Sequence, residues 1–243
     1  MAIIQLISDF QSGSFKIGLL HSQLLQGIKD VKIVDISHQI KLQNIVEAAF
    51  VVNQLEFDGN ETMITLVSVG SHSQNVIYKY RDKWYVFPNN GLISLVFEIN
   101  KNEWLYTCDN IELVKVLNQL ILNETSQLKR AENVVMLTQK KAMEHDHMIV
   151  CERIYTDPHG NCYFNLNRTQ FEQKFEQGKF SAKIQFVRDV HFYEIHNNYN
   201  SVGQGLALLM FSKKGYLKLA INQGNASKLF RIKENTVISI TQI

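Results

Sequence analysis

The sequence predicts α/β plus all-β architecture: an N-terminal α/β domain with a largely parallel sheet and a C-terminal small β-barrel domain. In the first half, strand-like apolar runs alternate with helix-like segments, which is the pattern of a layered α/β fold. In the second half, short strand-like runs follow one another between glycine-bearing turns, as in a small barrel or sandwich. Residues 123–133, between the halves, are polar and lack strong periodicity. We therefore expect domains at residues 1–125 and 126–243.

The elements of the first half follow from the spacing of apolar residues. Residues 2–8 form an apolar run that ends at Asp9, which indicates a buried strand. A helix is expected next, because apolar residues recur near helical spacing at Phe15, Ile17, Leu20, Leu24 and Ile28. Further helices are expected at residues 42–56, 90–100 (after an Asn cap) and 109–122. Further strands are expected at residues 31–37, 62–70, 75–80 and 83–88.

The second half reads as six strands interrupted by one short helix. The helix is expected at residues 169–177. The strands are expected at residues 147–156, 162–167, 181–187, 205–211, 215–221 and 235–243. No internal repeat interrupts this series.

Composition narrows the class of protein. The chain has 243 residues, 45% of them apolar, and a formal net charge of +2, so nothing suggests nucleic acid as a partner. Its three cysteines, Cys108, Cys151 and Cys162, form no C-x-x-C pair, which supports neither a disulfide framework nor a zinc site and fits a reducing cytoplasm. Asp9 interrupts the apolar N-terminus where a signal peptide would continue, and no apolar run approaches the roughly 18 residues of a membrane span. We expect a cytoplasmic protein with no membrane partner.

Polar residues follow three of the expected strands, where ligands bind to parallel sheets. Asp9 follows the first strand; its carboxylate can accept two hydrogen bonds from a ribose diol or cap the following helix. Asp35 lies near the end of the second expected strand, and we favour the interpretation that it caps the following helix. His38 alone is more often a hydrogen-bonded structural histidine than a ligand or a base. The sequence has no dinucleotide-binding or P-loop motif, so the residues by themselves indicate a polar cleft and no more.

Five fragments together resemble the S-adenosylmethionine (SAM) hydroxide adenosyltransferases, a family that also contains the fluorinase and chlorinase. The fragments are LISDFQSGSFKIGLL, KIVDISHQIKLQNIVEAAF, FPNNGLISLV, DPHGNCYFN and GYLKLAINQGNAS. They occur in order over nearly the whole chain. The resemblance implies a homotrimer with sites shared between subunits, and attack by water, hydroxide or halide at C5′ of SAM without a metal or other cofactor. Because the sulfonium is a good leaving group, such a protein mainly orients a desolvated nucleophile.

The resemblance also implies roles for seven residues in binding SAM or adenosine. Asp9 matches the aspartate that binds the ribose diol, and we favour that role over capping. Near adenine, Asn161 matches an asparagine that reads the base edge, while His159 stands where an aromatic ring stacks. Tyr199 matches the opposing aromatic wall, although ordinary barrel packing explains it equally well. The remaining matches are Asp157 near the methionine amine, Asn222 in the last adenine-binding segment, and Lys214 as one candidate partner of the methionine carboxylate.

The family's water-activating triad is missing. Family members carry an aspartate, an arginine and a histidine at positions that hold Leu66, Ser73 and Thr107 here. None of these can deprotonate water or replace a guanidinium. His72 and Cys108 are the weak replacement candidates, against the simpler readings of a polar loop residue and a buried, unactivated thiol.

Three hypotheses follow. The leading one is C5′ substitution on SAM, most simply SAM plus water to adenosine plus methionine, in a rebuilt nucleophile pocket. The second is a catalytically silent sensor of SAM or a related nucleoside. The third is a scaffold with neither activity.

Overall fold

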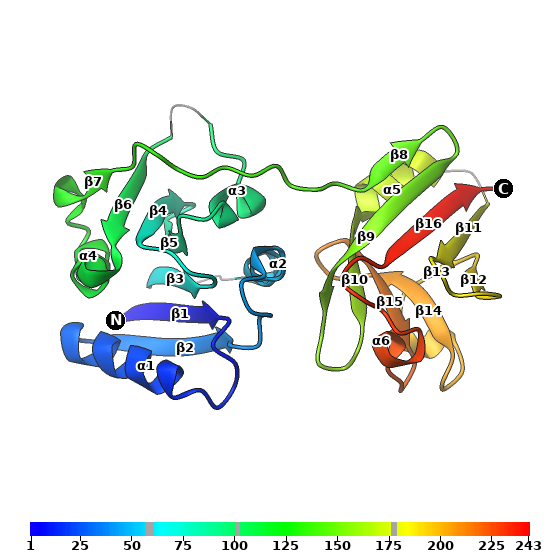
Figure 1. Cartoon of the computed structure of the whole chain (residues 1–243), viewed down its shortest axis with the longest axis horizontal. Helices are drawn as coiled ribbons and strands as arrows, with labels where there is room; N and C mark the ends of the chain where they lie inside the picture. The colour runs from blue at the N-terminus through cyan, green and yellow to red at the C-terminus, as the bar shows by residue number, and fades with distance from the viewer. Residues whose placement is uncertain (57–60, 101–102, 176–178) are drawn as a thin grey trace. The chain divides into compact units, whose positions relative to one another are not determined.

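The computed structural model describes residues 1–56, 61–100, 103–175 and 179–243, and the chain divides into two compact units, Met1–Gln139 and Lys140–Ile243. In Figure 1 the first unit runs from blue to green and the second from green to red. Each unit has its own sheet and its own apolar core.

The first unit is built on a seven-stranded mixed sheet with the order β2-β1-β3-β5-β4-β6-β7 (Figure 1). Three neighbouring pairs, β1–β2, β1–β3 and β3–β5, are parallel, whereas β4–β5, β4–β6 and β6–β7 are antiparallel. The expectation of a largely parallel sheet is therefore correct only for β2, β1, β3 and β5. The strands are β1 (Ala2–Ser8), β2 (Val31–Ser37), β3 (Thr62–Ser68), β4 (Gln74–Tyr80), β5 (Lys83–Pro88), β6 (Leu105–Asp109) and β7 (Lys129–Arg130).

A tight hairpin explains the change of direction in this sheet. Tyr80 pairs with Lys83, so only Arg81 and Asp82 connect β4 to β5. Both connecting residues have positive φ, 46° and 62°. A two-residue turn of this kind matches the twist of antiparallel strands. The sheet therefore reverses at β4, and β6 and β7 continue the antiparallel side.

Four α-helices accompany the described part of this sheet: α1 (Phe15–Gly27), α2 (Ile45–Gln54), α3 (Leu92–Val96) and α4 (Leu113–Ile121). Leu24 of α1 and Ile28, directly after this helix, pack in one apolar core with Leu117 and Leu120 of α4. Every second residue of the neighbouring strands contributes to the same core. Helices α2 and α3 contact each other, and their buried residues lie outside that core. Two short 3₁₀ helices, η1 (Asn110–Glu112) and η2 (Thr125–Gln127), flank α4.

The first unit extends past the expected boundary at residue 125. Strand β7 pairs with β6, and the extended segment after it is held by side chains near α3. Asn89 Nδ2 donates to the carbonyl of Asn133 at 2.8 Å, and its Oδ1 accepts from the Val135 N–H at 2.9 Å. Leu137 N–H donates to Ser94 Oγ at 2.7 Å. These bonds explain why the division falls after Gln139.

The second unit is a nearly closed, barrel-like sheet of nine strands, with the order β12-β11-β16-β9-β10-β15-β14-β13 and β8 paired to β9. All neighbouring pairs are antiparallel except β13–β14. Among the described residues the strands are β8 (Met143–His145), β9 (Met148–Thr156), β10 (Cys162–Asn167), β11 (Phe180–Ile184), β12 (His191–Phe192), β13 (Ile195–His196), β14 (Ala207–Phe211), β15 (Tyr216–Ile221) and β16 (Val237–Gln242).

Inward-facing side chains alternate along the strands of this unit. Cys162, Phe164 and Leu166 of β10 are fully buried, as the period of two requires. Helix α5 (Arg168–Phe175) adds Phe171 and Phe175 to the same core; the last two residues of the expected helix lie outside the described residues. Helix α6 (Ala226–Leu229) and η3 (Tyr199–Ser201) complete the unit. Within the ranges described, no helix has the length and apolar character to cross a bilayer.

A pair of leucines in α1 tests the packing of the first core. Leu24 is fully buried, whereas Leu19 on the same helix is 55% exposed. Leu24→Ala should lower the free energy of unfolding by about 2–5 kcal/mol, because it leaves a cavity between α1 and the sheet. Leu19→Ala should change it by about 0.5 kcal/mol or less. Urea unfolding followed by circular dichroism measures both, and equal effects would contradict this packing.

Candidate functional site

Asp9 joins three loops at the carboxyl ends of the parallel strands. Its side chain is 7% exposed, and Oδ2 accepts from the backbone N–H of Gln43 at 2.8 Å and of Gly70 at 2.9 Å. Its own N–H donates to the carbonyl of Ser68 at 3.3 Å. The carboxylate thus ties the end of β1 to the segments that follow β2 and β3. It does not cap α1, because Ser14 is the N-cap residue of that helix.

The backbone around Asp9 adopts tight turns that its sequence permits. Gly70 has φ of 80°, and a Cβ there would lie 3.3 Å from Asn90 Nδ2, so glycine fits best. Asn90 in turn donates from Nδ2 to the carbonyl of Val69 at 3.0 Å. Gln11 links the loop after β1 to the loop after β2, donating from its backbone N–H to His38 O at 2.8 Å and from Nε2 to Ile40 O at 2.7 Å.

The three positions of the missing triad hold side chains without charge. Leu66 lies in β3 and is 2% exposed, within the apolar core. Ser73 is exposed in the loop before β4. Thr107, in β6, donates from Oγ1 to the carbonyl of Asn75 at 3.0 Å. None of these groups can take a proton from water at neutral pH.

A polar network that the sequence did not reveal lies beside these positions. His72 Nε2 lies 3.1 Å from Asn75 Oδ1, and its Nδ1 lies 3.2 Å from the carbonyl of Gly70. Asn75 Nδ2 donates to Asn110 Oδ1 at 2.8 Å, and Asn110 Nδ2 donates back to His72 O at 2.8 Å. Asn75 is 1% exposed, so its amide depends on this network for hydrogen bonds. Since Gly70 also donates to Asp9, the network adjoins the Asp9 loops.

Cys108 is not an activated nucleophile. It lies opposite Asn75 in the β4–β6 pair and is 2% exposed. Burial, followed by the charge of Glu112, raises the pKa of its thiol to about 11, and the Asn75 amide opposes this rise only in part. The thiol is therefore neutral at physiological pH. The other cysteines, Cys151 and Cys162, are likewise buried and free.

In the second unit, Asp157 and Asn161 bind each other in the turn between β9 and β10. Asp157 Oδ1 accepts from the Asn161 backbone N–H at 2.9 Å, and Oδ2 accepts from Asn161 Nδ2 at 2.8 Å and from Tyr163 OH at 3.3 Å. Burial and the neighbouring Asp157 raise the pKa of Tyr163, which keeps its hydroxyl a donor. Gly160 has φ of 86° and no room for a Cβ beside Asn225. His159 is exposed at the tip of this turn.

Tyr199 packs on a buried lysine. Lys218 Nζ donates to Tyr199 OH at 3.1 Å and lies 4.8 Å from the centre of the Tyr199 ring. Lys218 is 8% exposed, whereas Lys214, which the sequence singled out, is exposed. No sequence pattern singles out Lys218, because it lies within an otherwise apolar strand. Asn222, 8% exposed, donates from Nδ2 to the carbonyl of Val202 at 2.8 Å. Tyr199 and Asn222 thus both have structural partners.

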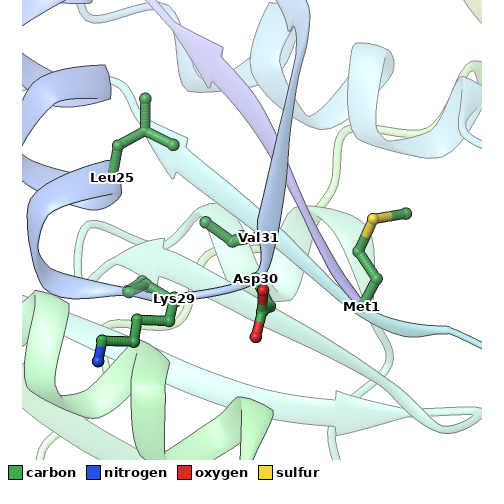
Figure 2. Close-up of a pocket in the computed structure, with 6 residues that line it drawn as sticks. Met1, Leu25, Lys29, Asp30 and Val31 are labelled. Carbon is green, nitrogen blue, oxygen red and sulfur yellow. The ribbon is translucent and has the colours of Figure 1, made fainter.

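A cavity of about 700 Å³ lies at the other end of the first sheet. Met1, Leu25, Ile28, Lys29, Asp30 and Val31 line it, and Figure 2 shows five of these side chains labelled around the opening. It borders the amino ends of β1 and β2, whereas ligands of such sheets bind at the carboxyl ends. The Asp9 edge is therefore the better candidate site in the first unit.

The family is settled by two matches that together span most of the chain. The N-terminal domain model of the SAM hydroxide adenosyltransferases matches residues 4–142, and the C-terminal domain model matches residues 151–239. The chain belongs to the SAM hydroxide adenosyltransferase family. An (R)-S-adenosyl-L-methionine hydrolase of Methanocaldococcus jannaschii is similar to it, with 23% identity over 95% of this chain and 92% of that protein.

Two solved structures share the fold. An uncharacterized conserved protein from Thermotoga maritima superposes with a TM-score of 0.82 at 20% identity, covering 99% of this chain and all of that one. A conserved hypothetical protein from Thermus thermophilus superposes with a TM-score of 0.73 at 17% identity, with full coverage of both chains.

The three thiols give a test of the site as described. Because the thiol pKa of Cys108 is raised to about 11 and all three cysteines are buried, the folded protein should react slowly with a thiol-specific disulfide reagent at pH 7.5. Unfolding in guanidinium should release three fast-reacting thiols. Rapid labelling of Cys108 in the folded protein, lost in Cys108→Ser, would show an activated cysteine and contradict this description.

Proposed function

We propose that this protein catalyses nucleophilic substitution at C5′ of SAM, with water as the nucleophile. The water oxygen forms a bond to C5′ while the C5′–S bond breaks and its electron pair returns to sulfur. The sulfonium becomes the neutral thioether of methionine, the nucleoside becomes adenosine, and one proton is released. Family membership over most of the chain is the observation that carries this proposal.

Asp9 is the proposed ribose-binding residue. Its Oδ2 is held by two backbone N–H groups, so the carboxylate has a fixed orientation at the strand ends. A fixed acceptor loses little freedom when a diol binds, which favours binding and alignment of C5′. Asp157, His159, Asn161, Tyr199, Asn222 and Lys214 are proposed as the further binding residues, in a homotrimer with sites shared between subunits.

His72 is the proposed acceptor of the water proton, through Nδ1. Because Nε2–H donates to Asn75 Oδ1, Nδ1 carries the lone pair, and it would turn from the Gly70 carbonyl toward the water. With Leu66, Ser73 and Thr107 at the triad positions, it is the imidazole of the polar network that adjoins the Asp9 loops. Asn75 and Asn110 hold the ring and the loop that carries it. A positioned general base contributes typically about 10²–10⁴-fold to a rate.

The second candidate is a sensor that binds SAM or adenosine without turnover. The uncharged side chains at all three triad positions and the neutral Cys108 thiol favour it. A sensor would use the same proposed nucleoside contacts as the proposed enzyme and would lack only the general base.

The experiment is SAM turnover in ¹⁸O-labelled water, with adenosine and methionine separated by chromatography and mass spectrometry. We expect adenosine carrying ¹⁸O at the 5′ position and unlabelled methionine, above the spontaneous decay of SAM. His72→Ala should lower kcat by about 10²-fold with little change in KM. His191→Ala, an exposed histidine in β12, is the control and should react as wild type.

Three outcomes are informative. If the protein releases adenosine and His72→Ala does not slow this release, the proposed reaction stands and the role of His72 as the proton acceptor is rejected. SAM that binds but stays intact would reject catalysis and support the sensor. SAM that neither binds nor reacts would reject both functions.

A further inference from the structure

Two histidines and one aspartate converge on the sheet edge that carries Asp9. His21 lies on α1, Asp35 in β2, and His38 directly after β2. The Nε2 atoms of His21 and of His38 each lie 2.9 Å from Asp35 Oδ1. The ligand atoms of the three residues lie within 4.8 Å of one another. Asp35 lies within β2 and does not cap a helix, so the capping role favoured from the sequence is wrong; Asn44 caps α2.

His38 is built to direct one nitrogen into this cluster. Its side chain is 9% exposed, and Ser8 Oγ lies 2.7 Å from its Nδ1. Ser8 is itself 1% exposed and is fixed by the N–H of Phe10 at 3.3 Å. The opposite nitrogen, Nε2, is buried and makes no hydrogen bond of acceptable geometry within the described residues, although it lies close to Asp35. A buried nitrogen that lies 2.9 Å from a carboxylate without a well-formed hydrogen bond, beside a second imidazole, points to a shared ligand.

The cluster offers ligand atoms that suit a cation: a carboxylate oxygen of Asp35 and the Nε2 atoms of His21 and His38. The tautomer in which His38 Nδ1–H donates to Ser8 Oγ leaves a lone pair on Nε2, facing Asp35, and this is the tautomer that would bind a metal.

We propose that His21, Asp35 and His38 form a binding site for a divalent transition-metal ion of the zinc type. Two imidazole nitrogens with one carboxylate suit zinc, whereas magnesium and calcium prefer oxygen ligands. At a bond length of about 2.0–2.1 Å, the His–Asp35 ligand atoms 2.9 Å apart subtend an angle near 90° at the ion. The two histidine nitrogens, which lie within 4.8 Å of each other, would have to come within about 4.1 Å to bind the same ion. Asp35 is 42% exposed, which leaves a fourth position to water.

Such an ion would act on the loops of the candidate site without entering the proposed reaction. It would clamp α1 to the end of β2 through His21 and Asp35. Its third ligand, His38, accepts at its carbonyl from the Gln11 N–H at 2.8 Å, in the loop that follows Asp9. Bound metal would therefore stabilise the fold and restrict the Asp9 loop.

The test is zinc titration of the full-length protein after treatment with a chelator. Calorimetry should show one equivalent of zinc, and cobalt(II) should give visible absorption bands of a low-coordinate site. His21→Ala should weaken zinc at least tenfold and abolish the rise in Tm that zinc causes. His191→Ala is the matched control, because its Nδ1 also meets a serine hydroxyl, Ser181 Oγ at 3.1 Å, and it should bind zinc as wild type. Magnesium should not bind.

Two results would overturn the site. One is wild-type protein that takes up no zinc, which would show that the two histidines only contact Asp35. The other is His21→Ala that binds zinc as tightly as wild type, which would place the metal elsewhere. Both readouts are independent of SAM turnover.

Discussion

The candidate site in the first unit depends on one buried carboxylate. Asp9 accepts two backbone N–H groups on a single oxygen, from loops that follow β2 and β3, while it ends β1. Removing it would leave both N–H groups without their acceptor, at about 1–3 kcal/mol each if they stay buried. The same bonds fix the direction of the carboxylate. Structural support and the proposed ligand contact are therefore joined in one side chain.

Much of the fold was readable from local patterns. The alternating burial of β9 and β10 and the apolar run of β1 are what strand periodicity predicts. The antiparallel side of the first sheet was missed, although only two residues separate β4 from β5, which is a hairpin signal. The short strand β7 and the segment after it are polar, so only pairing partners distant in sequence reveal where they belong.

The candidate site was predictable only in part. Asp9 stood out because a strand ends there. Asn75 and Asn110 could not be found from spacing, since an amide in an alternating strand or a loop carries no signature until its partners are known. The same holds for His21, which reaches Asp35 and His38, themselves three residues apart, only because α1 packs beside β2. The triad positions can be recognised only through the family resemblance, and with Leu66, Ser73 and Thr107 there the proposed reaction would depend on neighbouring groups.

The most direct measurement is a calorimetric titration of adenosine and of SAM into wild-type protein and Asp9→Asn. Asparagine keeps an acceptor for the two backbone N–H groups but removes the charge, so the variant should fold with a Tm close to that of wild type. If Asp9 binds the ribose diol, Asp9→Asn should bind both ligands at least about tenfold more weakly. Equal affinities at equal Tm would show that the carboxylate only fastens the loops, and would contradict the nucleoside site at this edge of the sheet.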